Sequence, residues 1–274
     1  MKTLSGHKLL LDADCPMCRI YGKGFEKAAW VDKETYSPYQ YFDASAGAIV
    51  DMDKARNEIA LVDTQHNVVR YGIDAFKYIL TNRFHELNPV LSWAPIDFFL
   101  RKLYKFISFN RKVIAPSEIK EGERACMPDL NVKYRLLYIA FVVVVSSTVL
   151  YHFTQPINGL LGWQNHLGRE FLICVGQIIW QLIFLKNILK EKQLDYIGNM
   201  MTVSMIGTLL LLPMLLLKGM FPVFNLVYFG GVVGFMLWEH IRRSKILQIG
   251  FYPSVSWVLY RVVTLAILVM LNEF

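Results

Sequence analysis

The apolar residues of this chain are concentrated in its second half. Five apolar segments follow one another there, at residues 135–153, 169–189, 197–217, 220–240 and 255–272. Each is about as long as the ~20 residues that a helix needs to cross a bilayer. The first half instead mixes short apolar runs with polar stretches, as globular domains do. The pattern therefore predicts a globular N-terminal domain followed by an all-α transmembrane domain of about five spans.

The first half is predicted to follow the order β-α-β-α-β-β-α. The expected strands lie at residues 9–11, 36–42, 58–63 and 68–71, and the expected helices at 16 to about 30, 51–56 and 73–82. Residues 64–67 form a polar tetrapeptide between two β-type runs, which favours a hairpin turn. This order of elements is that of a thioredoxin-like α/β domain.

Residues 95–112 have the period of an amphipathic helix. Apolar side chains line one face, and Arg101, Lys102 and Lys105 lie on the other. Basic amphipathic helices bind anionic membrane surfaces, but the same pattern suits a helix that packs its apolar stripe on its own domain. The sequence leaves both interpretations open.

Composition separates the chain into the same two parts. It is 54% hydrophobic with a mean hydropathy of +0.34, which is too apolar for an ordinary soluble protein. Residues 1–133 contain 19 of the 29 Lys and Arg and 17 of the 22 Asp and Glu. We expect a domain at 1–115, a polar linker at 116–133 and a membrane domain at 134–274. Most of the +7 net charge flanks apolar segments, so we expect a lipid bilayer as a partner and no nucleic acid.

The basic residues also predict an orientation. The loop at 154–168 has no Lys or Arg, whereas basic residues cluster before the first span and after the second and fourth. They are Lys120, Arg124, Lys133, Arg135, Lys186, Lys190, Lys192, Arg242, Arg243 and Lys245, with Lys218 in the short third loop. Because Lys and Arg favour cytoplasmic loops, the N-terminal domain is expected in the cytoplasm, on an inner or cytoplasmic membrane.

Candidate chemistry is concentrated at Cys15-Pro16-Met17-Cys18, directly after the first strand. Thiols at i and i+3 on a first helical turn share one face, and the helix N-terminus stabilises a thiolate. Pro16 suits the first helical position. The pattern favours a redox dithiol in which Cys15 attacks and Cys18 resolves the mixed disulfide.

Two other interpretations of the cysteine pair stay open. It could be half of a zinc site, for which only His7 and Cys126 are suggestive further ligands. It could also be two small apolar residues in a core. The redox interpretation needs no metal and no cofactor besides the dithiol itself.

The residues around the pair resemble a known family. Asp12-x-x-Cys15-x-x-Cys18 resembles the DxxCxxC signature of the DCC thiol-disulfide oxidoreductases. Residues 69–75 look like that family's strand, glycine and helix start, and residues 103–112 like its closing helix, so the resemblance covers about 8–115. It implies a thioredoxin-like fold, a redox pair at Cys15 and Cys18, and Asp12 as the motif acid.

Several details qualify that resemblance. Asp12 could move a proton or form an Asx turn, and Asp14 is expected to cap the helix that starts at Pro16. Thioredoxins place a cis-proline before the hairpin strand opposite the dithiol, but residues 56–58 before Ile59 contain none. Either the substrate groove is built differently, or exchange with protein disulfides is not the native reaction.

The membrane half matches no family that we recognise. Beyond the pair, the cysteines are Cys126 and Cys174, so a transmembrane dithiol relay is not indicated. His152, His166 and His240 are interpreted as scattered interfacial histidines, and Arg261 as a residue in a structural pairing.

The sequence therefore predicts a membrane-anchored thiol-disulfide oxidoreductase that exchanges with a protein or small-thiol partner. The alternatives are a non-catalytic structural or signalling subunit whose thioredoxin-like domain binds a partner protein, and a transporter. A transporter would need polar side chains to converge inside the bundle, and beyond Arg261, Gln177 and Gln181 the spans offer few. The sequence does not define an oligomeric state.

Overall fold

The computed structural model describes residues 3–42, 50–117, 128–164, 166–216 and 222–272. The chain divides into two compact units, Met1–Tyr134 and Arg135–Phe274. Much of the expected linker lies outside the described residues, and so do Lys120, Arg124, Cys126 and Lys218.

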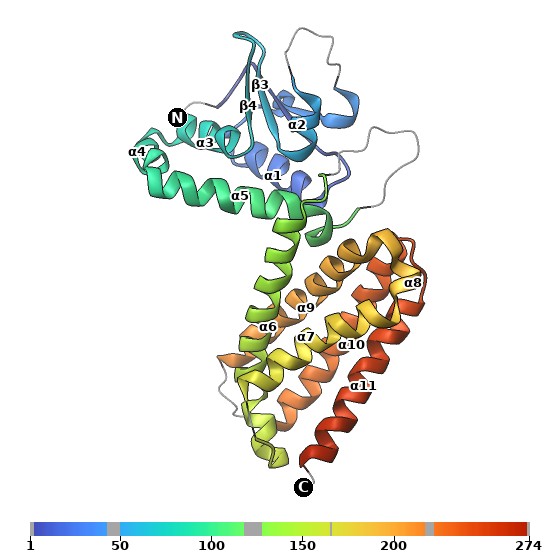
Figure 1. Ribbon diagram of the computed structural model, residues 1–274. Coiled ribbons are helices and arrows are strands. Elements are labelled where there is room, and N and C mark those ends of the chain that lie inside the picture. Colours follow the sequence, from blue (N-terminus) through green and yellow to red (C-terminus); the bar gives the residue numbers. More distant parts are fainter. Residues whose placement is uncertain (1–2, 43–49, 118–127, 165, 217–221, 273–274) are drawn as a thin grey trace. The chain divides into compact units, whose positions relative to one another are not determined.

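The first unit is built on a small mixed sheet (Figure 1). Its strands are β1 (His7–Leu11), β2 (Tyr36–Pro38), β3 (Ala60–Asp63) and β4 (Val68–Tyr71), in the spatial order β2-β1-β3-β4. β1 pairs with β2 in parallel, and the β1–β3 and β3–β4 pairs are antiparallel. A parallel pair needs a crossover connection, which α1 supplies here.

The helices of this unit confirm the predicted order of elements. They are α1 (Pro16–Lys27), α2 (Met52–Asn57), α3 (Ile73–Arg83), α4 (Asn88–Ser92) and α5 (Ala94–Ile114), with short 3₁₀ turns at Lys33–Thr35, Tyr39–Tyr41 and His85–Leu87. α1 ends three residues before the expected end because Ala29 adopts a left-handed φ of 53°. The predicted strand at 36–42 is shorter than expected, since a 3₁₀ turn follows Pro38.

Both faces of the sheet are covered. Leu9, Leu11 and Leu61 pack with α1 and α3 on one face, in the same cluster as Cys15 and Cys18. Leu10, Ala60 and Val62 point to the other face, against Tyr39 and the short helix α2. A strand buried on both faces is apolar at consecutive positions, which is why residues 9–11 are all leucine. The dithiol therefore lies in the core beside the α1–α3 face.

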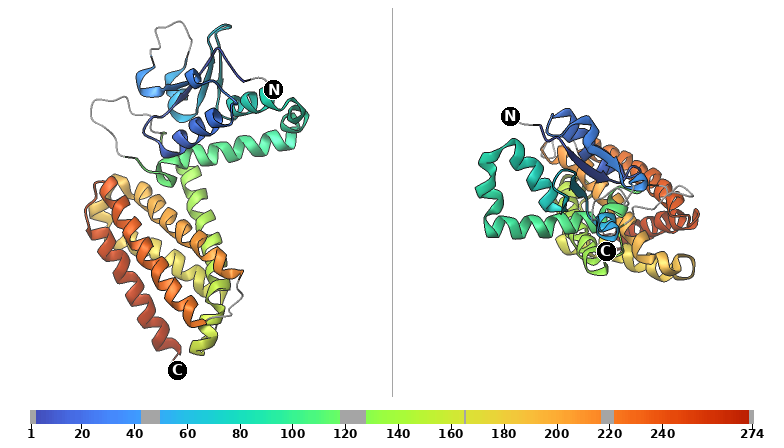
Figure 2. Two further views of the ribbon diagram at one scale, coloured as in Figure 1. Left: turned by 180° about the vertical axis from the view of Figure 1, so that it is seen from behind. Right: turned by 90° about the horizontal axis from the view of Figure 1, so that it is seen from above.

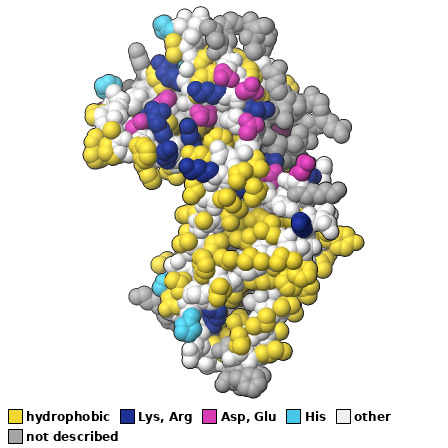
Figure 3. Space-filling model, viewed as in Figure 1, with side chains coloured by type: hydrophobic (Ala, Val, Ile, Leu, Met, Phe, Trp, Pro, Cys, Tyr) yellow, Lys and Arg dark blue, Asp and Glu magenta, His cyan; other side chains and the backbone are white. Residues whose placement is uncertain are grey.

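The second unit is helical. It contains α6 (Val132–Leu161, which begins in the first unit), α7 (Leu167–Phe184), α8 (Lys186–Leu189), α9 (Gln193–Leu215), α10 (Pro222–Ile246) and α11 (Tyr252–Asn272), with a 3₁₀ turn at Lys190–Lys192. Five of these helices are long and apolar enough to cross a membrane, which confirms the predicted number of spans and indicates a membrane protein. α9 packs on α10, and α7 on α11 (Figure 2). The visible surface of this unit is mostly hydrophobic, whereas charged side chains gather over the first unit (Figure 3).

Polar side chains converge inside the helical unit, contrary to the expectation that the spans offer few. His240 lies buried between Tyr196, whose hydroxyl is 3.1 Å from Nε2, and Ser254, whose Oγ is 2.9 Å from Nδ1. His240 is therefore a buried residue that connects three helices through its hydrogen bonds. Tyr138 and Thr202 add another buried contact, with their hydroxyls 2.8 Å apart.

Two arginine contacts complete this description, one from the buried Arg243 and one from the partly exposed Arg261. Arg243 donates to Glu239 Oε1 at 2.7 Å on its own helix and to Asn199 Oδ1 at 2.9 Å on α9. The guanidinium of Arg261 stacks on the indole of Trp257, 3.9 Å from the ring centre. Arg261 therefore forms a cation–π contact with Trp257, which lies one turn away on the same helix.

Candidate functional site

The two cysteines of the predicted site lie where β1 passes into α1. β1 ends at Leu11 and α1 begins at Pro16, so Cys15 is the N-cap residue and Cys18 is in the first turn. Pro16 occupies the first helical turn, as predicted. The expectation that Asp14 caps this helix is wrong, because the turn after β1 is one residue longer than a cap at Asp14 requires. Both cysteines are thiols and both are buried.

The two thiols have unlike tendencies to ionise. The Cys18 thiol hydrogen-bonds to the Cys15 sulfur, which is the largest cause of a Cys15 pKa lowered to about 6 despite burial. The Cys18 backbone N–H and the positive charge of Arg111 lower this pKa further, and Asp12 opposes them. The same hydrogen bond, together with burial, raises the pKa of Cys18. At neutral pH the pair therefore favours one thiolate, on Cys15, and one thiol.

Asp12 shapes the turn that carries the pair. Its Oδ1 accepts a hydrogen bond from the Asp14 backbone N–H at 3.0 Å, which is an Asx turn. The same oxygen accepts from the Gln40 side-chain amide at 2.8 Å, and Gln40 Oε1 in turn accepts from the Ala13 N–H at 3.1 Å. Of the two roles left open for Asp12, the contacts favour turn formation.

Gln40 is a site residue that sequence reasoning missed. It lies in the 3₁₀ turn after β2, and no motif marks it. The parallel register that pairs Leu11 with Pro38 carries Gln40 to the turn after β1. Only knowledge of that pairing could have identified it.

Arg111 is the second missed residue, since sequence reasoning included it only in the resemblance to the family's closing helix. It lies near the end of α5, is buried, and its Nη2 donates to the Arg56 carbonyl at 2.6 Å. Its positive charge helps to lower the pKa of Cys15, and at Cys18 it opposes the larger causes that raise the pKa. α5 thus folds back to supply the cation of the site.

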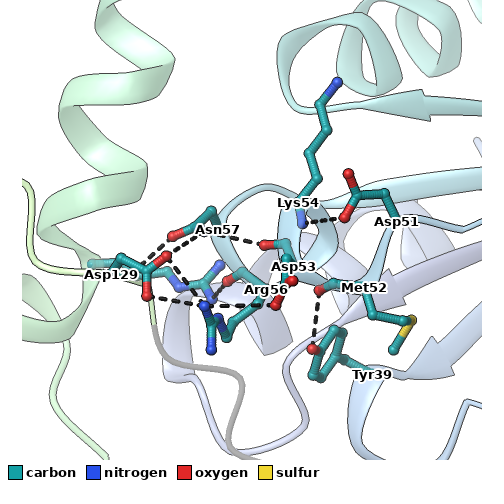
Figure 4. Close-up of polar contacts among 9 residues, drawn as sticks. Tyr39, Asp51, Met52, Asp53, Lys54, Arg56, Asn57 and Asp129 are labelled. Atoms are coloured by element: carbon teal, nitrogen blue, oxygen red, sulfur yellow. Dashed lines mark hydrogen bonds and ion pairs between the residues drawn. The ribbon is translucent and has the colours of Figure 1, made fainter.

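The segment before β3 is held from two sides. Arg56 Nη2 bonds both carboxylate oxygens of Asp129, at 3.0 and 3.2 Å (Figure 4). Asn57 donates to the same carboxylate at 2.9 Å and accepts from the Asp129 backbone N–H at 2.8 Å. The Arg56 carbonyl also accepts the hydrogen bond from Arg111 Nη2. Arg56 therefore connects the Asp129 carboxylate to Arg111, the cation of the site.

A cavity of about 280 Å³ adjoins the pair between α1, α3 and α5. Cys18 and Arg111 line it, and Cys15 does not. Its other walls are mainly apolar side chains, among them Phe76, Leu100 and Leu103. Access to the buried dithiol through this cavity is therefore at Cys18.

Among the described residues, none joins the pair to form a zinc site. His7 begins β1, at the end of the strand away from the cysteines, where its Nε2 lies 3.6 Å from Asp63. Cys126 lies outside the described residues. Within the described ranges, no three His, Cys, Asp or Glu side chains are grouped so that they could hold a metal ion.

Compared with protein-family models, with curated proteins and with solved structures, the chain gives no match.

Proposed function

We propose that this protein is a membrane-anchored thiol-disulfide oxidoreductase of the DCC type. Cys15 attacks a disulfide as the thiolate, and Cys18 resolves the mixed disulfide. The observation that carries the proposal is the placement of the two buried thiols at the start of α1, Cys15 at the N-cap and Cys18 in the first turn. There, hydrogen bonding from the Cys18 thiol lowers the pKa of Cys15 and raises that of Cys18, which favours one thiolate beside one thiol. Such an asymmetric pair suits nucleophilic attack followed by resolution.

The fold of the first unit supports the thioredoxin-like part of this proposal. The sheet order β2-β1-β3-β4, with one parallel and two antiparallel pairs, suits a thioredoxin-like domain, and the dithiol follows the first strand as in that fold. The first unit departs from thioredoxin at the segment before β3, as its sequence predicts. The described residues contain no cis peptide bond, so the position before β3 lacks the thioredoxin feature.

The proposal also includes an orientation. Basic residues lie at or near the ends of the long helices, among them Arg135, Lys186, Arg242 and Arg243. The loop between α6 and α7 has no Lys or Arg, and Arg169 lies within the first turn of α7. This distribution supports a first unit in the cytoplasm. In that reducing compartment the resting pair is the dithiol.

Replacing Cys18 with serine is expected to trap substrates on Cys15. Without the resolving thiol, a mixed disulfide formed by the Cys15 thiolate persists. Adducts trapped in cells by rapid acidification are separated on a non-reducing gel. A Cys15→Ser/Cys18→Ser variant is the matched control and should show no adduct.

The outcome decides between catalysis and the alternative subunit role. Adducts that vanish in the double variant support exchange at Cys15. Absence of any Cys15-dependent adduct, together with full cellular function of the double variant, would instead support a non-catalytic subunit that binds a partner protein.

Labelling of Cys15 in whole cells tests the orientation. An impermeant maleimide is expected to leave Cys15 unlabelled in intact cells and to label it after the membrane is permeabilised. The measurement is site-resolved mass spectrometry of the peptide that carries Cys15. Equal labelling before and after permeabilisation would overturn the cytoplasmic assignment.

A further inference from the structure

The backbone opposite the dithiol is covered by α5. Three consecutive turns of that helix each place a side chain on the segment before β3. The Tyr104 hydroxyl accepts from the Ile59 N–H at 3.0 Å, and Ser108 Oγ donates to the Asn57 carbonyl at 2.5 Å. Arg111 donates to the Arg56 carbonyl at 2.6 Å. Arg56 and Asn57 are in the last turn of α2, and Ile59 is the extended residue before β3. An extended peptide would bind beside a strand through the N–H and carbonyl of such a residue. Both groups of Ile59 are already bonded, to the Tyr104 hydroxyl and to the Gly72 N–H.

The cavity between α1, α3 and α5 reaches the pair at Cys18. One side of this cavity is lined by Ile59 and by the α5 residues Tyr104, Ser108 and Arg111. Cys18 also lies in the cavity wall. A volume of about 280 Å³ lies at the lower limit of small-molecule sites. The mainly apolar lining favours a ligand with an apolar body, because burying polar groups there would cost hydrogen bonds with water.

We infer that the substrate of the dithiol is a low-molecular-weight disulfide whose apolar body binds in this cavity and whose sulfur atoms extend past Cys18 to Cys15. This inference rests on the proposed function and specifies its substrate class. A disulfide in an extended protein segment is disfavoured for two reasons. The backbone groups that would bind the segment are already bonded, and the cavity is too small to hold it.

The reaction balances with the substrate alone. The Cys15 thiolate forms a bond to one substrate sulfur, the substrate disulfide bond breaks, and the leaving thiolate takes the proton of Cys18. The Cys18 thiolate then attacks Cys15 Sγ and releases the second substrate thiolate, which takes a proton from water. The protein pair loses two electrons and becomes a disulfide, and the substrate gains them as two thiols.

The test compares disulfides in single turnovers of the full-length reduced protein in lipid nanodiscs. The probes are lipoamide (a cyclic disulfide on a short aliphatic chain), oxidised glutathione and insulin. The Cys15–Cys18 disulfide is counted by alkylation and mass spectrometry, and each rate is divided by the rate of the same probe with dithiothreitol. We expect the normalised rate for lipoamide to exceed the other two by about tenfold or more.

Filling the cavity supplies the matched variants. Leu80→Phe and Leu100→Phe add volume in the cavity wall, and Leu87→Phe makes the same change in a 3₁₀ turn outside it. The cavity variants should slow lipoamide about tenfold and slow oxidised glutathione and insulin by less, and Leu87→Phe should alter none of the three rates. Two cavity variants are used so that a folding defect in one does not decide the result.

The outcomes separate the inference from the proposed function. Equal normalised rates for the three probes, or equal slowing of all three by the cavity variants, would overturn the substrate class and leave the oxidoreductase intact. If no probe oxidises the pair while adducts also fail to form on Cys15 in cells, the proposed function itself fails.

Discussion

Removal of the Cys18 thiol is expected to raise the pH at which Cys15 is half alkylated from near 6 to roughly 7 or above. The hydrogen bond from Cys18 is the largest cause that favours the Cys15 thiolate, while burial favours the neutral thiol. In Cys18→Ala burial still acts but the thiol donor is gone. A higher pH is then needed to form the same fraction of thiolate. The measurement is the rate of Cys15 alkylation by iodoacetamide from pH 5 to 9, resolved by mass spectrometry.

Two charge variants provide controls of opposite sign. Arg111→Met removes a positive charge that stabilises the thiolate, so its midpoint should also rise, by less than that of Cys18→Ala. Asp12→Asn removes a negative charge that opposes the thiolate and keeps an oxygen acceptor for the Asp14 N–H, so its midpoint should fall. A Cys18→Ala profile identical to that of the parent protein would show that the pair is not electrostatically asymmetric.

Replacing Arg243 with alanine is expected to destabilise the helical unit by about 3 kcal/mol or more. The Arg243 side chain is 4% exposed and binds Glu239 on α10 and Asn199 on α9. Without it, the Asn199 oxygen loses this donor and the buried Glu239 carboxylate loses one of its two arginines. A buried charge left without compensation is more costly than the loss of a surface pair.

Arg242 is the matched control for that prediction. It binds the same Glu239 carboxylate at 2.6 Å, but its side chain is 42% exposed. Arg242→Ala should therefore cost about 1 kcal/mol or less. In thermal unfolding of the purified protein in detergent, Arg243→Ala should lower the midpoint by roughly 10 °C and Arg242→Ala by only a few degrees. Equal shifts of the unfolding midpoint would contradict the prediction that removing the buried arginine costs more stability than removing the exposed one.

The sequence alone predicted the elements that depend on local pattern. Five apolar runs of membrane-spanning length became five long helices. The strand, turn and helix around the cysteine pair were also predicted, with Pro16 in the first turn. These features follow from hydrophobic periodicity and from the fixed geometry of proline, both of which act within one or two helical turns.

The site around the pair required long-range contacts. Gln40 reaches Asp12 through the parallel pairing of β1 and β2, and Arg111 reaches the cysteines because α5 folds back over the segment before β3. Neither residue belongs to a local motif that assigns it a role. The Asp14 prediction was wrong for a local reason, since a one-residue difference in turn length moved the N-cap to Cys15.

The same division holds in the membrane half. The sequence determined that five segments are long and apolar enough to cross a membrane, because the hydrophobicity of a segment is a property of that segment alone. It did not determine that His240 meets Tyr196 and Ser254, which come from two other helices. In the first unit the sequence determined where the dithiol lies, and in the second it determined where the apolar helices lie. In both units the tertiary structure decided which distant side chains surround them. The physical reason is that periodicity records which face of an element is buried, whereas the partner on that face depends on how separate elements pack.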